Sequence, residues 1–319
     1  MLKHIGQIKL SGIALPACSV KTSAKVPDTF IKKDILERRT TTPYTTLAPL
    51  YDSLLGNRFF PQLRHTFEWL VHRYGIRFVS AADVACGTGT FVRYLCKHGT
   101  TLVYGVDRSP EMLRAAIGKN QTTGARFLLQ DFGTLTLPQP VALITCCFYS
   151  LNYLLTTAEL QRALARFHDN LSPGGYAIFD MVTDRPGWQG SEPIIEPMIT
   201  PGGAVTLITR WDPRLHIQTV HVSILRKGRS HREIHRQRGY PVAVVAHLVA
   251  RARLMLVGIH DFRTLRPATL WTSQAVYVAR KPWGGEFTNG QNVQGRTIGA
   301  GRIDDYQPQS TGVAKLFHC

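Results

Sequence analysis

Hydrophobic and polar positions along this chain alternate between unbroken apolar runs and segments with helical spacing. The apolar runs are typical of strands buried on both faces of a parallel sheet. They predict strands at residues 78–85, 101–106, 126–130, 141–148 and 176–182. Helical spacing, and a Ser109–Pro110 helix start, predict helices at residues 59–74, 91–97, from 110 onward and at 157–170. This alternation predicts a doubly wound α/β sheet.

The pattern changes after residue 200. Residues 204–210 and 215–225 alternate between apolar and polar positions, which is typical of antiparallel strands, and residues 211–214 carry the turn between them. A helix at 241–253 and strands at 254–259 and 275–280 complete the ordered part. We therefore expect an antiparallel hairpin, within residues 204–238, inserted ahead of the last helix.

The two ends of the chain lack such periodicity. Residues 1–40 carry four lysines and no acid in their first 27 positions, and they predict a basic, flexible extension. An organellar targeting peptide stays open as an alternative. Residues 282–319 are polar and predict a mostly disordered tail. The folded domain should therefore span residues 41–281.

Composition narrows the class of protein. No apolar run is long enough for a transmembrane helix, so we expect no membrane contact. The 6 cysteines show no disulfide or zinc spacing, and no other set of side chains demands a metal. Free buried cysteines are typical of a reducing compartment, and we expect a cytoplasmic protein.

The strongest motif is a glycine turn followed by an acid at a fixed distance. Gly87 and Gly89 follow the first buried strand, and Asp107 ends the second. An acid in that position binds the hydroxyls of a nucleotide-type ribose. The third glycine of a dinucleotide site is replaced by Val92, and no phosphate-binding loop is present. The turn therefore favours a ligand with a ribose and no phosphate, such as S-adenosylmethionine (SAM).

The chain resembles the class I SAM-dependent methyltransferases. Their first two motifs are similar to residues 83–89 and 105–113, their adenine-contacting segment to residues 130–132, and the turn into their fifth strand to residues 171–180. Residues 51–56 resemble a short helix found ahead of the core in many small-molecule members. The resemblance implies a Rossmann-like, seven-stranded, mostly parallel sheet with an antiparallel last strand, and a hairpin that serves as a lid over the site.

The resemblance also implies the cofactor-binding residues. Asp107 would bind both ribose hydroxyls, Asp83 would orient the turn and the amino group of SAM, and Asp131 and Phe132 would bracket the adenine. Met112 would pack on the adenine. Alternatives stay open: a helix cap for Asp107, a plain turn residue for Asp131 and ordinary core packing for Met112. The full set is Tyr51, Asp83, Ala85, Cys86, Gly87, Gly89, Asp107, Arg108, Met112, Asp131, Phe132, Cys147 and Phe148.

Residues on the acceptor side are less defined. Tyr149 stands where similar proteins often carry an acid, and its phenol would orient a substrate or act as a weak base. Asn152 and Tyr153 are expected in the acceptor pocket, with capping and packing as the alternative. Glu233 and His235 share one strand face, which we expect to turn toward the site. His235 is the candidate general base because histidine titrates near neutral pH, and a surface histidine is the alternative.

The net charge of +17 is regional. Residues 201–280 hold 13 Lys and Arg against 3 Asp and Glu, concentrated in residues 226–238. Such a segment is either a phosphate-binding surface or a solvated strand pair. It lacks interleaved aromatic residues for base stacking, which disfavours nucleic acid and leaves an anionic small substrate open.

Three hypotheses for the function follow. The leading one is a SAM-dependent methyltransferase that acts on an O or N of a small molecule by in-line displacement. The second is an RNA methyltransferase acting on tRNA or rRNA, motivated by the basic segment. The third is a non-catalytic SAM-binding protein, motivated by Tyr149 in place of an acid. Because the cofactor carries the reactive group, a missing general base does not exclude activity.

Overall fold

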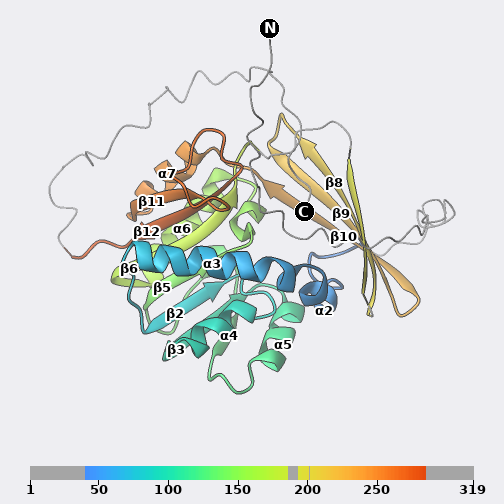
Figure 1. Cartoon of the computed structure of the whole chain (residues 1–319), viewed down its shortest axis with the longest axis horizontal. Helices are drawn as coiled ribbons and strands as arrows, with labels where there is room; N and C mark the ends of the chain where they lie inside the picture. The colour runs from blue at the N-terminus through green and yellow to red at the C-terminus, as the bar shows by residue number, and fades with distance from the viewer. Residues whose placement is uncertain (1–39, 186–192, 201, 285–319) are drawn as a thin grey trace, which may run out of the picture.

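The structure is a computed structural model that describes residues 40–185, 193–200 and 202–284. The predicted basic extension, except Thr40, and nearly all of the predicted polar tail lie outside these residues. The described chain forms two sheets (Figure 1). One has seven strands in the order β11-β12-β6-β5-β2-β3-β4, and the other has five in the order β1-β10-β9-β8-β7.

The seven-stranded sheet confirms the predicted Rossmann-like core. Its strands are β2 (Ser80–Val84), β3 (Leu102–Asp107), β4 (Arg126–Leu129), β5 (Val141–Cys146), β6 (Leu171–Val182), β11 (Met255–Asp261) and β12 (Gln274–Arg280). The pairs β2–β3, β3–β4, β2–β5 and β5–β6 are parallel. β12, the last strand of the described residues, is antiparallel to both β6 and β11. The antiparallel last strand is therefore where the sequence predicted it.

Helices cover both faces of this sheet. They are α3 (Asn57–Arg73), α4 (Thr90–Lys97), α5 (Pro110–Lys119), α6 (Thr157–Asn170) and α7 (Val242–Arg251). Leu164 of α6 and Val249 of α7 belong to one core cluster, whereas Phe67 of α3 and Leu95 of α4 belong to another. β5 supplies side chains to both clusters, and all of its residues except Thr145 are apolar, which is typical of a central parallel strand.

The predicted lid hairpin is part of a larger sheet. Its strands are β7 (Ile194–Thr200), β8 (Gly203–Asp212), β9 (Ile217–Arg226) and β10 (Arg229–Arg238), with the two-residue β1 (Thr40–Thr41) parallel to β10. The sequence did not predict β7. It is an edge strand that contains Pro197, and its Ile195 and Ile199 are exposed. Such a strand needs no buried apolar face, so it lacks the alternation that predicted the other strands.

One face of the five-stranded sheet packs on the chain ahead of α3. Val205, Val222 and Ile224 of the sheet form a core cluster with Leu50 of α2 (Ala48–Tyr51) and Leu54 of the following π-helix (Asp52–Gly56). This third cluster fixes the part of the chain directly ahead of α3 against the sheet. The same part of the chain also borders the site.

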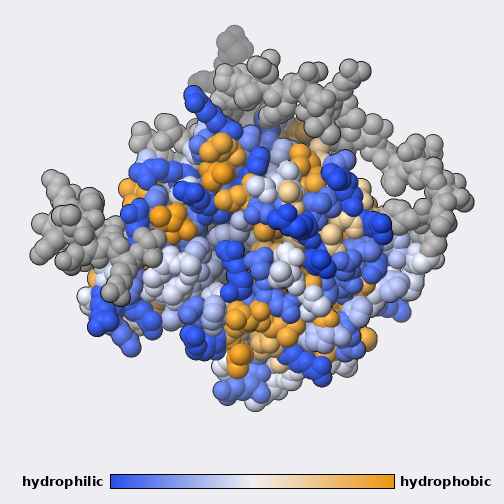
Figure 2. Space-filling model, turned by 180° about the vertical axis from the view of Figure 1, so that it is seen from behind, coloured by the Kyte–Doolittle hydropathy of each residue, from blue (hydrophilic) through white to orange (hydrophobic). Residues whose placement is uncertain are grey.

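Among the residues that the structure describes, no helix is long and apolar enough to cross a membrane. On the face in Figure 2 the apolar residues form separate small groups among hydrophilic ones, which is ordinary for a protein surface.

Candidate functional site

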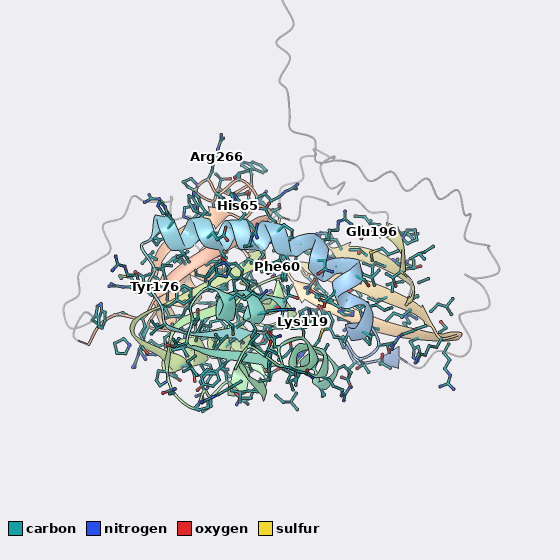
Figure 3. All side chains as sticks on the ribbon, turned by 60° about the horizontal axis from the view of Figure 1, so that its bottom comes forward. Phe60, His65, Lys119, Tyr176, Glu196 and Arg266 are labelled. Carbon is teal, nitrogen blue, oxygen red and sulfur yellow. The ribbon has the colours of Figure 1, made fainter. Side chains whose placement is uncertain are left out.

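A cavity of about 400 Å³ opens at the carboxyl ends of β2, β3 and β5. The strand order reverses between β5 and β2, which is where open α/β sheets bind ligands. Phe60 of α3 lies between that helix and the sheet and also lines the cavity (Figure 3). All of the predicted cofactor residues except Gly89 line it: Tyr51, Asp83, Ala85, Cys86, Gly87, Asp107, Arg108, Met112, Asp131, Phe132, Cys147 and Phe148.

The glycine turn between β2 and α4 has two distinct requirements. Gly87 has φ +54° and open space where a Cβ would lie, and its N–H donates to Oδ2 of Asp107 at 2.8 Å. Gly89 has φ +73°, and a Cβ there would lie 2.7 Å from Nδ2 of Asn120 and 2.9 Å from Cβ of Ala116. Gly89 therefore lets α4 pack closely on α5, while Gly87 leaves room for a ligand.

Substituting Gly89→Ala is expected to lower the free energy of unfolding by about 3 kcal/mol, because it adds a clash to an unfavourable backbone conformation. Gly99→Ala is the matched control: Gly99 has φ +85° but nothing within 4 Å of the added Cβ, so it should lose only about 1 kcal/mol. Urea denaturation measures both. Equal losses would show that the clash with α5 adds nothing to the loss in the free energy of unfolding.

Asp107 lies at the base of the cavity and is 9% exposed. Its carboxylate accepts from the N–H of Gly87 and of Ser109, each at 2.8 Å. Burial raises the pKa of this carboxyl group although both N–H groups oppose the rise. The cap of α5 is Ser109, whose Oγ accepts from the N–H of Met112. Because a carboxylate has about four acceptor sites, Asp107 keeps two for a ligand.

Asp83 lies deeper, at the end of β2, where it is 4% exposed. Its Oδ1 accepts from Oγ1 of Thr145 at 2.7 Å. Burial raises the pKa of Asp83 to about 7, against the opposing effect of Thr145 and with the help of the nearby Asp107. The group therefore exchanges its proton near neutral pH.

This raised pKa predicts a pH-dependent stability. The unfolded chain gives up the Asp83 proton at a lower pH than the folded chain, so the free energy of unfolding should fall as pH rises from about 4 to about 7. Relative to wild type, Asp83→Asn should gain on the order of 2 kcal/mol between pH 5 and pH 8. Urea denaturation across this range checks it, with Asp169→Asn on the exposed face of α6 as control. A difference between Asp83→Asn and wild type that does not change with pH would contradict it.

The predicted adenine-binding residues stand at one side of the opening. Phe132 and Met112 are buried and line the cavity. Asp131 accepts from the N–H of Gly133 at 3.1 Å, which caps the 3₁₀ helix Phe132–Thr134, and lies 3.8 Å from the guanidinium of Arg108. Half of each of these two charged side chains is exposed. They therefore border the opening.

A partly buried polar network beside the turn was not predicted from the sequence. Thr88 Oγ1 donates to Oδ1 of Asp52 at 2.5 Å. Lys119 Nζ, at the end of α5, contacts Oδ2 of Asp52 and donates to Thr88 at 3.0 Å and Thr90 at 2.7 Å. The network ties the π-helix to the glycine turn, and it explains why Asp52 follows Tyr51 in the motif at residues 51–56.

Tyrosines form the side of the cavity that faces the five-stranded sheet. Tyr44, Tyr51 and Tyr153 line the cavity. The hydroxyls of Tyr44 and Tyr153 lie 2.8 Å apart, and the rings of Tyr44 and Tyr51 meet edge to face. Tyr153 was a predicted pocket residue. Tyr44 was not, because its segment has no periodic pattern.

Asn152 and Tyr149 are not among the lining residues. Asn152, in the 3₁₀ helix Ser150–Tyr153, is fully buried and donates to the carbonyls of Val182 and Arg238, so it joins β6 to β10. The hydroxyl of Tyr149 donates to Oε1 of Gln274 at 2.9 Å. The structure thus places Asn152 at a junction between the sheets and Tyr149 against β12.

Glu233 and His235 lie behind the tyrosines. Glu233 is fully buried and accepts from the N–H of Tyr44 (2.7 Å), Thr46 (2.6 Å) and Leu47 (3.0 Å). His235 contacts Glu233 at 3.1 Å through Nε2 and Tyr153 at 2.7 Å through Nδ1. No described residue of β7–β10 lines the cavity, so the sheet meets it through the segment that Glu233 holds.

No group of three or more His, Cys, Asp and Glu side chains in the described ranges could hold a metal ion. The cavity instead fits SAM: it combines a size typical of small-ligand sites, a buried acid with two free acceptor positions and an open glycine turn.

Two kinds of comparison place the chain among known proteins. Residues 81–175 match a protein family described as a methyltransferase domain. A dTDP-3-amino-3,6-dideoxy-α-D-glucopyranose N,N-dimethyltransferase of Streptomyces fradiae is 34% identical over 111 residues, which are 35% of this chain and 42% of that protein. A dTDP-3-amino-3,4,6-trideoxy-α-D-glucopyranose N,N-dimethyltransferase of Streptomyces venezuelae is 34% identical over 102 residues, 32% of this chain and 41% of that protein. The chain thus matches less than half the length of these relatives.

Solved structures share the fold over a longer span. A SAM-dependent methyltransferase of Clostridium acetobutylicum superposes with a TM-score of 0.65 at 21% identity and covers 75% of this chain and 99% of its own. CalS10, an amino pentose methyltransferase of Micromonospora echinaspora solved with SAM bound, gives a TM-score of 0.53 at 19% identity, over 69% of this chain and 90% of its own. The domain match and the fold agree: residues 81–175 match a methyltransferase domain, and the described chain has the Rossmann-like fold of solved SAM-dependent methyltransferases.

Proposed function

We propose that this protein transfers a methyl group from SAM to an amino nitrogen of a small molecule. The observation that carries the proposal is the cavity at the switch point of the sheet, with Asp107 at its base. Two backbone N–H groups hold that carboxylate in place, and its remaining acceptor positions suit two ribose hydroxyls.

The chemistry requires positioning and the removal of a proton. SAM supplies an electrophilic methyl group: its C–S bond breaks with the electron pair going to sulfur, while the lone pair of the acceptor nitrogen forms the new N–C bond. Asp107 would bind the cofactor, and Phe132 and Met112 would pack around its adenine. Tyr44, Tyr51 and Tyr153 would enclose the acceptor and exclude water.

The names of the relatives favour nitrogen over oxygen as the acceptor atom. Both Streptomyces proteins are N,N-dimethyltransferases of amino sugars carried on dTDP. Residues 81–175, which match the methyltransferase domain, include most of the cofactor side of the cavity. An amino sugar, or a small amine of similar size, is therefore the substrate class we propose.

The basic segment does not favour the RNA hypothesis. Arg232 and Arg236 alternate with Glu233 and His235 along β10, so they lie on the opposite face of the sheet. Arg232 contacts His221 of β9 on that face. Glu233 and His235, not these arginines, contact the residues that line the cavity. A phosphate backbone bound by the arginines would lie on the far side of the sheet from the site.

Cellular placement is a separate proposal. Cys86, Cys146 and Cys147 are buried and free in the part of the chain that the structure describes. Burial raises the pKa of each thiol well above its usual value, which keeps the thiols protonated and unreactive. Free thiols in a core are typical of proteins in a reducing compartment, which supports the cytoplasm.

The test of the proposed function is turnover of the full chain with SAM and dTDP-3-amino-3,6-dideoxyglucose. Mass spectrometry should show the sugar gaining one and then two methyl groups, with one S-adenosylhomocysteine formed for each. The same sugar with a hydroxyl in place of the amine is the matched control and should gain none.

Two other outcomes would contradict the proposal. Methylation of bulk tRNA or rRNA but of no amine would favour the RNA hypothesis. SAM binding without transfer to any acceptor in a panel of amino sugars and small amines would favour the non-catalytic one.

A further inference from the structure

Four side chains form a continuous hydrogen-bonded chain from the interior of the protein to the cavity. Glu233 Oε2 lies 3.1 Å from Nε2 of His235, and Nδ1 of His235 lies 2.7 Å from the hydroxyl of Tyr153. That hydroxyl lies 2.8 Å from the hydroxyl of Tyr44. The inner two residues are almost fully buried, and both tyrosines line the cavity.

The direction of each hydrogen bond follows from the charge state of Glu233, which is the innermost of the four residues. Although burial alone would raise it, the pKa of Glu233 is held below its usual value by hydrogen bonds from His235, Leu47, Thr46 and Tyr44. An ionised carboxylate can only accept, so Nε2 of His235 carries the proton of that contact. In a neutral imidazole the other nitrogen, Nδ1, is then an acceptor.

The same logic continues outward to the cavity. Tyr153 must donate its O–H to Nδ1 of His235, and its oxygen is left to accept from the O–H of Tyr44. The lone pairs of the Tyr44 oxygen are then available to a donor in the cavity. From Tyr44 to Glu233, every donor in the series therefore lies on the cavity side of its acceptor.

We propose that Tyr44, Tyr153 and His235 form a proton relay for methyl transfer, and that Glu233 positions it. The inference rests on the proposed function, because methylation of an amine leaves a proton that must depart. The N–H bond of the methylated ammonium breaks and its proton passes to the Tyr44 oxygen. The Tyr44 proton moves to Tyr153, and the Tyr153 proton moves to Nδ1 of His235. The acceptor becomes a neutral amine, and an imidazolium forms beside the Glu233 carboxylate.

A relay explains what a single phenol cannot. Burial raises the pKa of Tyr153 and of Tyr44 far above the usual range, so neither is a phenolate at neutral pH. Each can accept a proton only while it gives its own away. Counted from the cavity, His235 is the first member of the hydrogen-bonded series that has a basic nitrogen.

Besides Glu233, the charged groups that act on Tyr44 and Tyr153 are Asp107 and Arg108. The Arg108 guanidinium lies 5.8 Å from the centre of the Tyr153 ring, and Asp107 acts on Tyr44 from the other side of the cavity. Tyr51 of α2 packs on the Tyr44 ring. Glu233 lies two residues from His235 on β10 and is the acid in contact with it. An imidazolium would therefore form beside one carboxylate and remain sheltered from solvent.

The activities of single and double variants test the relay. Tyr153→Phe should lower kcat on the order of 100-fold, while calorimetry should find its SAM affinity within about twofold of wild type because no cofactor contact is lost. His235→Gln should lower kcat to a similar extent, and the double variant should be no slower than either single one, because both substitutions interrupt the same relay. Tyr74→Phe is the matched control: Tyr74 makes a similar hydrogen bond to His260 at 2.6 Å, and neither residue lines the cavity. Wild-type kcat in both site variants, or losses that multiply in the double variant, would overturn the relay.

A second measurement does not depend on turnover. ¹⁵N NMR of the imidazole nitrogens of the full chain with S-adenosylhomocysteine, assigned by difference from His235→Gln, should show a neutral His235 with its proton on Nε2. A proton on Nδ1 would overturn the relay whatever the substrate is. If this tautomer is found but no amine is methylated, the proposed function fails while the hydrogen-bonded chain stands.

Discussion

Replacing Asp107 by alanine is expected to weaken SAM binding by a factor on the order of 100 to 1,000. The carboxylate would provide two charge-assisted hydrogen bonds to the ribose, each contributing roughly 1.5–3 kcal/mol. The groups that hold this carboxylate are the backbone N–H of Gly87 and of Ser109, which are donors and cannot replace an acceptor. Equilibrium dialysis with labelled SAM measures the two dissociation constants.

Asp131→Ala is the control for a general charge effect. Its carboxylate is half exposed at the opening, so its removal should weaken SAM by no more than about tenfold. The urea concentration at the midpoint of unfolding must be close to the wild-type value for both variants. An Asp107→Ala protein that folds normally and binds SAM as tightly as wild type does would contradict the assignment of Asp107.

Replacing Glu233 by alanine is expected to lower the free energy of unfolding by about 3 kcal/mol. The substitution leaves the N–H groups of Tyr44, Thr46 and Leu47 and Nε2 of His235 without their shared acceptor in a buried place. Part of the loss is recovered if the segment loosens and its N–H groups reach water. Glu233→Gln keeps one acceptor oxygen and should lose less. Urea denaturation of the full chain measures each change.

Glu196→Ala separates this effect from a general effect of removing a carboxylate. Glu196 is exposed on the edge strand β7 of the same sheet (Figure 3), and its loss should change stability by less than about 0.5 kcal/mol. If Glu233→Ala were equally mild, Glu233 would not be the anchor of the segment that carries Tyr44.

The core and the cofactor side of the site were predictable because their signals are local. A central parallel strand is buried on both faces, so β2, β3 and β5 read as apolar runs in the sequence. The glycine turn and Asp107 lie at fixed distances along one βαβ unit, so their geometry follows from their spacing. The capping box of Thr156 and Glu159 likewise marks the start of α6 within four residues.

The acceptor side was not predictable in the same way, because its contacts join distant parts of the chain. Tyr44 and Glu233 are 189 positions apart, and no periodic pattern links them. Asp52 and Lys119 meet across 67 positions. The alternation along β10 identified the face that carries Glu233 and His235, but not the segment packed against it. Only the folded chain shows that this face meets the cavity through two tyrosines.

The central claim is that the cavity above Asp107 binds SAM, and calorimetric titration of SAM and S-adenosylhomocysteine into the full wild-type chain tests it most directly. We predict one binding site per chain, a dissociation constant in the micromolar range and competition between the two ligands. A folded chain that produces no binding heat with either ligand, at several temperatures, would contradict the claim.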